Sequence, residues 1–145
     1  MIQRIQSVWL LLAALMNAGV FMFDLYRADI TTNGITVTQH VRVNDNFPAM
    51  LIALVITIMP LIAIFLYKNR RRQRTMTTLC MVFTIGFIAN TLMRVSTFNN
   101  GSSAPANGSY WIGSILPVIA VVFLILALRG IRKDEKLVKS VDRLR

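Results

Sequence analysis

The chain has 145 residues, enough for one domain and no more. Hydrophobic residues make up 55% of it and include long uncharged runs, a composition that indicates an integral membrane protein and excludes an ordinary soluble one. The formal net charge of +10 comes almost entirely from positions 68–74 and the stretch after 128, where membrane topology explains it, so we expect no nucleic-acid partner.

Four uncharged runs are long enough to cross a bilayer as helices. At 1.5 Å per residue each gives about 30 Å of helix, the thickness of the hydrocarbon core. We therefore predict an all-α membrane protein with a single domain, 1–145. Its predicted helices are 5–23, 47–67, 75–95 and 110–128, its outer loops 24–46 and 97–109, its inner loop 68–74 and its inner tail 129–145.

The first run could alternatively be a secretory signal peptide, because the basic residue Arg4 precedes it. The run of 19 residues at 5–23 is too long for a typical signal core, and no clear small-x-small cleavage site follows it. We therefore expect a first transmembrane helix with its N-terminus inside.

The first outer loop carries a strong hairpin signal. Asn33-Gly34 lies between the β-branched stretches 30–32 and 35–37. Both residues of a tight hairpin turn need positive φ, which asparagine and glycine tolerate. We predict a small β-hairpin within 24–46. The second outer loop, 97–109, is small, polar and uncharged, so we predict that it is flexible.

The second predicted helix contains Pro60, which has no backbone N–H. We expect it to free a carbonyl near Ile56 and to kink the helix. The inner loop that follows is the strongest orientation signal in the chain, because translocating basic residues is disfavoured. Its basic residues are Lys68, Arg70, Arg71, Arg72 and Arg74.

The tail at 129–145 predicts an amphipathic helix lying on the inner membrane surface. Leu137, Val138, Val141 and Leu144 recur at helical spacing, and Glu135 precedes Lys139 by four residues. Its basic side chains suit anionic lipids or a partner protein. Those residues are Arg132, Lys133, Lys136, Lys139 and Arg143.

The basic residues also predict the orientation of the chain. With the termini and the 68–74 loop inside, 13 basic residues lie inside and 3 lie outside, the latter being Arg27, Arg42 and Arg94. Positive charge is retained on the cytoplasmic side, so we expect both termini in the cytoplasm.

A few polar side chains fall inside the predicted helices or at their outer boundary. Asn17 and Asn90 lie at similar depth in the outer half of the first and third helices, and Asp24 and Arg94 lie near the outer boundary. We expect these two helices to be in contact, with Asn17 near Asn90 and Asp24 near Arg94, as a structural clasp. An ion or substrate path is the alternative reading.

No arrangement of residues indicates an enzyme. The sequence shows no recognisable pattern of a nucleophile with a base, of paired carboxylates or of metal ligands. The outer acidic residues Asp24, Asp29 and Asp45 could gather with His40 into a metal site, but nothing in their spacing favours this over a solvated loop. The lone Cys80 excludes a disulfide within the chain, and no Cys/His cluster suits zinc or haem. We expect no cofactor.

The sequences at both ends of the chain resemble those of a known protein family. MIQRIQSVWLLLA at 1–13 resembles the opening of the domain-of-unknown-function 4293 family of the Bacteroidota, and IRKDEKLVKSVDRLR at 131–145 resembles its closing tail. The tail departs from the family pattern at Lys139 and Val141. The resemblance implies a Gram-negative inner membrane and no assigned activity. A tail recognisable by its particular residues further suggests a protein surface that binds it.

We therefore expect a non-enzymatic accessory subunit of an inner-membrane complex, such as a protein-export or envelope-assembly machine. Its expected partners are membrane lipids and other integral membrane proteins. A small homo-oligomeric transporter or channel is the first alternative, and a membrane enzyme using the outer-loop carboxylates is the second.

Overall fold

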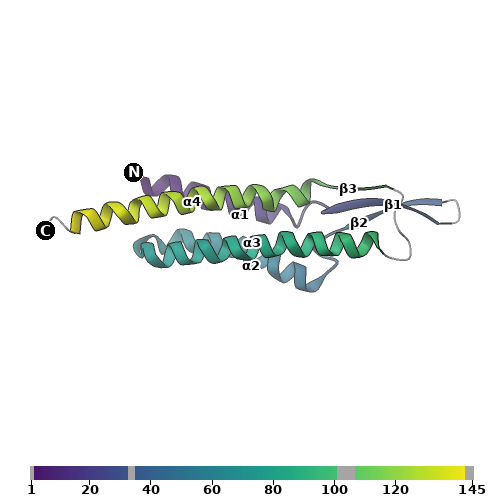
Figure 1. Ribbon diagram of the computed structural model, residues 1–145, viewed down its shortest axis with the longest axis horizontal. Helices are drawn as coiled ribbons and strands as arrows, with labels where there is room; N and C mark the ends of the chain where they lie inside the picture. Colours follow the sequence, from purple (N-terminus) through teal and green to yellow (C-terminus); the bar gives the residue numbers. More distant parts are fainter. Residues whose placement is uncertain (1, 33–34, 101–106, 143–145) are drawn as a thin grey trace.

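The computed structural model describes the backbone of residues 2–32, 35–100 and 107–142, and the side chains of 5–30, 35–100 and 107–138. Within these residues, the helices form an elongated bundle and the strands extend from one end of it (Figure 1). The helices are α1 (Ile2–Gly19), α2 (Phe47–Phe65), α3 (Arg70–Asn99) and α4 (Ile112–Asp142). The strands are β1 (Tyr26–Thr32), β2 (Ile35–Val41) and β3 (Asn107–Tyr110).

Each helix packs against two neighbours around the bundle. α1 lies against α2 and α4, and α3 lies against the same two helices from the other side. α1 and α3 are therefore diagonal to one another, which corrects the expectation that they would be the contacting pair. The start of α1 and the end of α4 lie at the end of the bundle opposite the sheet (Figure 1). We call these two ends of the molecule the basic end and the sheet end.

The buried residues of the helices follow one another at steps of four and three. Such steps place one stripe of side chains against neighbouring helices that cross at a shallow angle. The stripe on α2 is Ala49, Ala53, Ile56, Pro60 and Ala63. The stripe on α3 is Gln73, Thr77, Cys80, Thr84, Phe87, Thr91 and Val95. Small and polar residues thus dominate both buried stripes.

Many of the larger apolar side chains point outward instead. Leu54, Ile58, Val82 and Phe83 are all exposed on the bundle surface. Small residues inside and large apolar residues outside are typical of helices surrounded by lipid, where small side chains let the backbones approach closely. α2, α3 and α4 each contain a stretch long and apolar enough to cross a membrane, and α1 adds a shorter apolar stretch, Ile5–Gly19. The chain is a membrane protein, and its described residues form four α-helices.

Apart from the start of α2, the helix boundaries differ from those predicted. α1 ends at Gly19 rather than at 23, and residues 20–23 form turns that lead into β1. The inner loop at 68–74 is almost absent. A single 3-10 turn, η1 (Leu66–Lys68), ends α2, and the side chain of Asn69 caps α3 by accepting from the backbone N–H of Arg72 at 3.2 Å. Four of the five loop basic residues therefore lie on the first turns of α3, where arginine is a good helix former.

The tail is not a separate surface helix. It continues α4 without a break to Asp142 and projects beyond the other helices at the basic end (Figure 1). Gly130 has the lowest helix propensity of the residues there. Its lack of a side chain leaves room for Gln6, whose Cγ would lie 2.7 Å from an added Cβ. Ile131 is fully buried and Asp134 nearly so, which ties the start of the extension to the bundle.

The sheet has three strands where the sequence predicts two. β1 and β2 form the expected antiparallel hairpin, with Tyr26 opposite Val41. β3 then pairs antiparallel with the other edge of β1, with Tyr26 opposite Tyr110, so β1 is central. The predicted flexible loop 97–109 is thus wrong at both ends: α3 continues to Asn99, and Asn107–Tyr110 is a strand. Residues 33–34 and 101–106 lie outside the described part.

Candidate functional site at the basic end

Two ion pairs join the start of α3 to the extension of α4. Nη1 of Arg70 lies 3.0 Å from Oδ2 of Asp134, and Nη1 of Arg74 lies 2.7 Å from Oε2 of Glu135. The first pair is well shielded, since the Arg70 side chain is only 17% exposed and that of Asp134 only 9%. Because the bundle folds the start of α3 next to the end of α4, part of the positive charge there is neutralised internally.

A pocket of about 480 Å³ lies beside Arg70, where α1, the end of α2 and the start of α3 meet. We call it the basic-end pocket. Apolar and aromatic side chains form much of its wall, and two glutamines, one arginine and the hydroxyls of a serine and a tyrosine supply its polar groups. It is lined by Gln6, Ser7, Ile64, Phe65, Tyr67, Arg70 and Gln73.

Both glutamines of this pocket are almost fully buried, yet each keeps an unsatisfied group. Gln6 accepts a hydrogen bond from Nη1 of Arg70 at 3.3 Å, but its Nε2 has no partner among the described residues. Oε1 of Gln73 likewise has no described partner. A buried polar atom without a hydrogen bond costs about 1–3 kcal/mol. The basic-end pocket therefore presents one unused donor and one unused acceptor beside a partly buried cation.

Other predicted contact residues surround this end with positive charge. Lys68, Arg71 and Arg72 are exposed on η1 and α3. Arg132, Lys133 and Lys136 are exposed on the α4 extension, together with Leu137 and Val138 at 49% and 54%. The structure thus brings the loop and tail groups together at one end. The side chain of Lys139 and the whole of Arg143 lie outside what it describes.

The expected clasp residues have other partners than the ones predicted. Asn17 donates from Nδ2 to the backbone carbonyl of Ile56 on α2 at 2.9 Å, because α2 and not α3 is its neighbour. Oδ1 of Asn90 is buried with no partner in the described part of the chain. Arg94 donates from Nη1 to the backbone carbonyl of Arg42 at 3.3 Å. The freed carbonyl at Ile56 confirms the prediction made from Pro60.

Asp24 is the centre of an ionic cluster at the sheet end. Its buried carboxylate accepts from Nε of Arg42 at 2.5 Å and Nε of Arg27 at 2.7 Å, and lies 2.8 Å from Nδ1 of His40. Burial opposes ionisation of this carboxyl, but the three hydrogen bonds outweigh it and lower its pKa from 3.8 to about 2. The guanidinium of Arg27 also lies 4.0 Å from the ring centre of Trp111. Asp24 therefore fastens the sheet to the end of α1.

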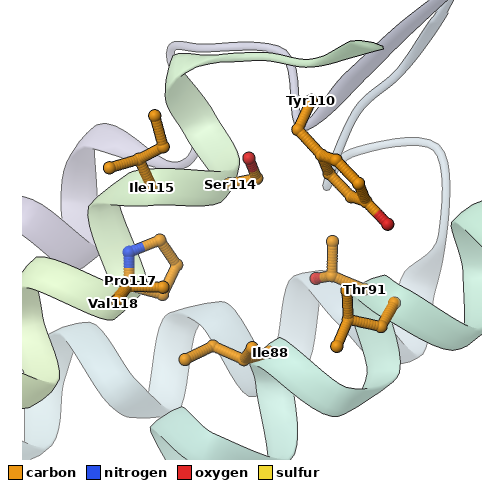
Figure 2. Close-up of a pocket in the computed structure, with 8 residues that line it drawn as sticks. Ile88, Thr91, Tyr110, Ser114, Ile115, Pro117 and Val118 are labelled. Carbon is orange, nitrogen blue, oxygen red and sulfur yellow. The ribbon is translucent and has the colours of Figure 1, made fainter. Parts of the chain in front are cut away.

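A second cavity, of about 300 Å³, lies between α3 and α4 near the sheet end (Figure 2). Ile88 and Thr91 of α3 face Pro117 and Val118 of α4 across it, and Tyr110 lies over its outer side. The hydroxyl of Thr91 donates to the backbone of Phe87 at 2.9 Å, and that of Ser114 donates to the backbone of Trp111 at 2.8 Å. The hydroxyls of Thr91 and Ser114 are thus already satisfied, and the mainly apolar cavity suits hydrocarbon.

The outer acidic residues do not gather into a metal site. Asp29 accepts from the Thr38 hydroxyl at 2.7 Å, and Asp45 accepts from the backbone N–H of Arg42 at 2.9 Å. Only Asp24 is bonded to His40. No group of three potential ligands among His, Cys, Asp and Glu is close enough to hold a metal ion within the described residues.

The sequence predictions missed the polar residues of the basic-end pocket. Gln73 lies among four arginines and was assigned to a solvated loop. Gln6 falls within the predicted first helix, 5–23, but is assigned no role there. A signal was present: Gln6, Leu10, Ala13 and Asn17 step by four, three and four, which places Gln6 on the buried stripe.

The chain belongs to the DUF4293 family, a domain of unknown function whose family model matches residues 2–144. No curated protein matches the chain.

Proposed function

We propose that this member of the DUF4293 family is a non-enzymatic accessory subunit of a complex in the bacterial inner membrane, with both chain ends in the cytoplasm. Protein-export and envelope-assembly machines are the candidate complexes. The observation that carries the proposal is the projection of α4. Its extension stands beyond the other helices and exposes Leu137 and Val138 among basic side chains (Figure 1). Apolar residues exposed within a charged surface are typical of protein contacts.

The proposed orientation is supported by where the charges lie. The start of α3 and the extension of α4 lie together at the basic end, whereas Arg27, Arg42 and Arg94 lie at the sheet end. Positive charge retained on one side marks the cytoplasm. A membrane-impermeant maleimide should therefore label Ser109→Cys in intact spheroplasts and Lys68→Cys only after lysis. The native Cys80 is buried and gives a low background. The reverse labelling pattern would refute the orientation.

The accessory role is tested by native mass spectrometry of the tagged protein, extracted in mild detergent at its native expression level. We expect stoichiometric foreign subunits. Replacing Leu137 and Val138 together by serine should release them. The matched control replaces Ile35 and Val37, an equally exposed apolar pair on β2, and should retain them. Loss in the control alone would move the contact to the sheet. A pure homo-oligomer would overturn the proposal in favour of a small transporter or channel.

A further inference from the structure

We propose that the basic-end pocket binds one phospholipid whose headgroup carries a hydrogen-bond donor beyond its phosphate, such as phosphatidylethanolamine or phosphatidylglycerol. The inference rests on the unused polar groups of the pocket, on its apolar wall and on its level in the bundle. It does not depend on which complex the protein joins or on which leaflet faces this end.

The phosphate is specified by Arg70 and Gln6. Both described contacts of Arg70 use Nη1, which leaves Nε and Nη2 for a further acceptor. Because the guanidinium donates to Oε1 of Gln6, the amide is oriented with its unpartnered Nε2 available as a second donor. A phosphodiester is anionic and accepts from several donors at once, so it satisfies both groups together.

Gln73 accounts for the hydrogen-bond donor that the headgroup must carry in addition to its phosphate. Its Oε1 is a buried acceptor without a described partner, and it lines the same pocket as the two donors. A phosphate oxygen cannot satisfy it, because only an N–H or O–H can donate to a carbonyl. Ethanolamine and glycerol headgroups carry such a donor next to the phosphate. A choline headgroup does not, since its nitrogen is fully methylated.

The wall of the pocket favours a lipid over a soluble phosphate. Ile64, Phe65 and Tyr67 line it where the apolar stretch of α2 ends, and Phe65 and Tyr67 are 80% and 49% exposed. An aromatic residue at the end of an apolar helix lies at headgroup level in a membrane. Basic pockets between helices at this level suit lipid headgroups, whose acyl chains continue along the bundle.

The test is native mass spectrometry of the full chain released from nanodiscs of equal parts phosphatidylethanolamine, phosphatidylglycerol and phosphatidylcholine. We expect one retained lipid and at least about tenfold preference for the two donor headgroups over choline, since an unsatisfied buried acceptor costs about that factor. Millimolar inorganic phosphate should not displace the lipid. Equal retention of all three lipids would refute the proposal, and displacement by phosphate would identify a soluble-anion site instead.

Two variants distinguish recognition from folding. Gln73→Met removes the acceptor, keeps the side-chain length and should bring donor lipids down to the choline level. Because it also removes an unsatisfied buried group, its melting temperature without lipid should be unchanged or higher. Arg70→Gln should lose retention of all three lipids. Arg72→Gln, which removes a charge from an exposed position on the same helix turn, should behave as wild type. Equal losses in Arg70→Gln and Arg72→Gln would show that only net charge matters and would overturn the site.

Discussion

The side-chain amide of Asn17 on α1 donates a hydrogen bond of 2.9 Å to the backbone carbonyl of Ile56 on α2. In a regular helix this carbonyl would accept from the residue four positions later, but that residue is Pro60. The thiol of Cys80 on α3 approaches the same carbonyl at 3.7 Å. One proline thus creates an acceptor to which two neighbouring helices donate.

Replacing Asn17 by leucine should lower the unfolding free energy by about 1 kcal/mol, the typical size of a polar contact between membrane helices. The same replacement should have a smaller effect in a Pro60→Ala background, because alanine returns an N–H to Ile56. Reversible unfolding in mixed micelles measures both. Equal effects in the two backgrounds would show that Pro60 does not create the acceptor for Asn17.

The Asp24 cluster should make the stability of the folded protein depend on pH in the acid range. The folded pKa of Asp24, about 2, is below its usual 3.8. Its ionic contacts therefore stabilise the fold fully above the unfolded value and lose that effect as pH falls from about 4 to about 2. We expect the melting temperature in non-ionic detergent to fall over this window.

Asp24→Asn should have a lower melting temperature than wild type at pH 7 and a flatter acid profile. Asp29→Asn is the matched control, since Asp29 is only partly buried and bonds to the Thr38 hydroxyl. It should keep the wild-type profile. If Asp24→Asn and wild type lose stability in parallel, other carboxyls cause the acid transition.

Gly113 is required by a close approach of two backbones. Its N–H donates to the carbonyl of Asp24 at 3.0 Å, and an added Cβ would lie 2.5 Å from that oxygen and 2.8 Å from the carbonyl oxygen of Phe23. Gly113→Ala should destabilise the protein by about 1–3 kcal/mol, because backbone atoms must move. Gly86 has no neighbour within 4 Å of an added Cβ, so Gly86→Ala should stabilise α3 by up to about 1 kcal/mol. Thermal unfolding of the two variants gives opposite signs if this packing is correct.

The third strand can be tested by disulfide trapping. Asp29 lies opposite Asn107 on β3 and opposite Thr38 on β2. The pair Asp29→Cys with Asn107→Cys should therefore oxidise readily, as should Asp29→Cys with Thr38→Cys. The pair Thr38→Cys with Asn107→Cys spans two strand spacings, about 9.6 Å, and should stay reduced. Mobility on non-reducing gels, before and after addition of an oxidant, shows whether a disulfide forms in each of the three double variants. Efficient bonding of the third pair would show that β1 is not central.

Much of the membrane architecture could be predicted, because it follows from local patterns. The start of α2 at Phe47 was predicted to the residue, since Asn46 caps it and the apolar stretch follows at once. The Asn33-Gly34 turn likewise predicted the pairing of β1 with β2. Such signals depend on neighbours in sequence, which a single chain displays directly.

The missed features depend on contacts between distant segments. β3 is a strand because β1 offers it an open edge; of its own residues, Asn-Gly-Ser-Tyr, only the tyrosine favours strands. The α4 extension stays in line with α4 because Asp134 meets Arg70 across the bundle. Asn17 bonds to Ile56 and not to Asn90, because α2 is the neighbour of α1 and α3 is diagonal to it. The depth of a residue in the membrane does not show which helices are neighbours.

The central place of β1 also constrains how the protein is made. β2 leaves the ribosome directly after β1, whereas β3 follows only after all of α3. One edge of β1 is therefore open while α2 and α3 are being inserted, and it closes only when the chain has returned to the sheet end. Late closure links completion of the sheet to correct insertion of α3, so a nascent chain with α3 misplaced would keep an unpaired strand edge that can pair with another chain.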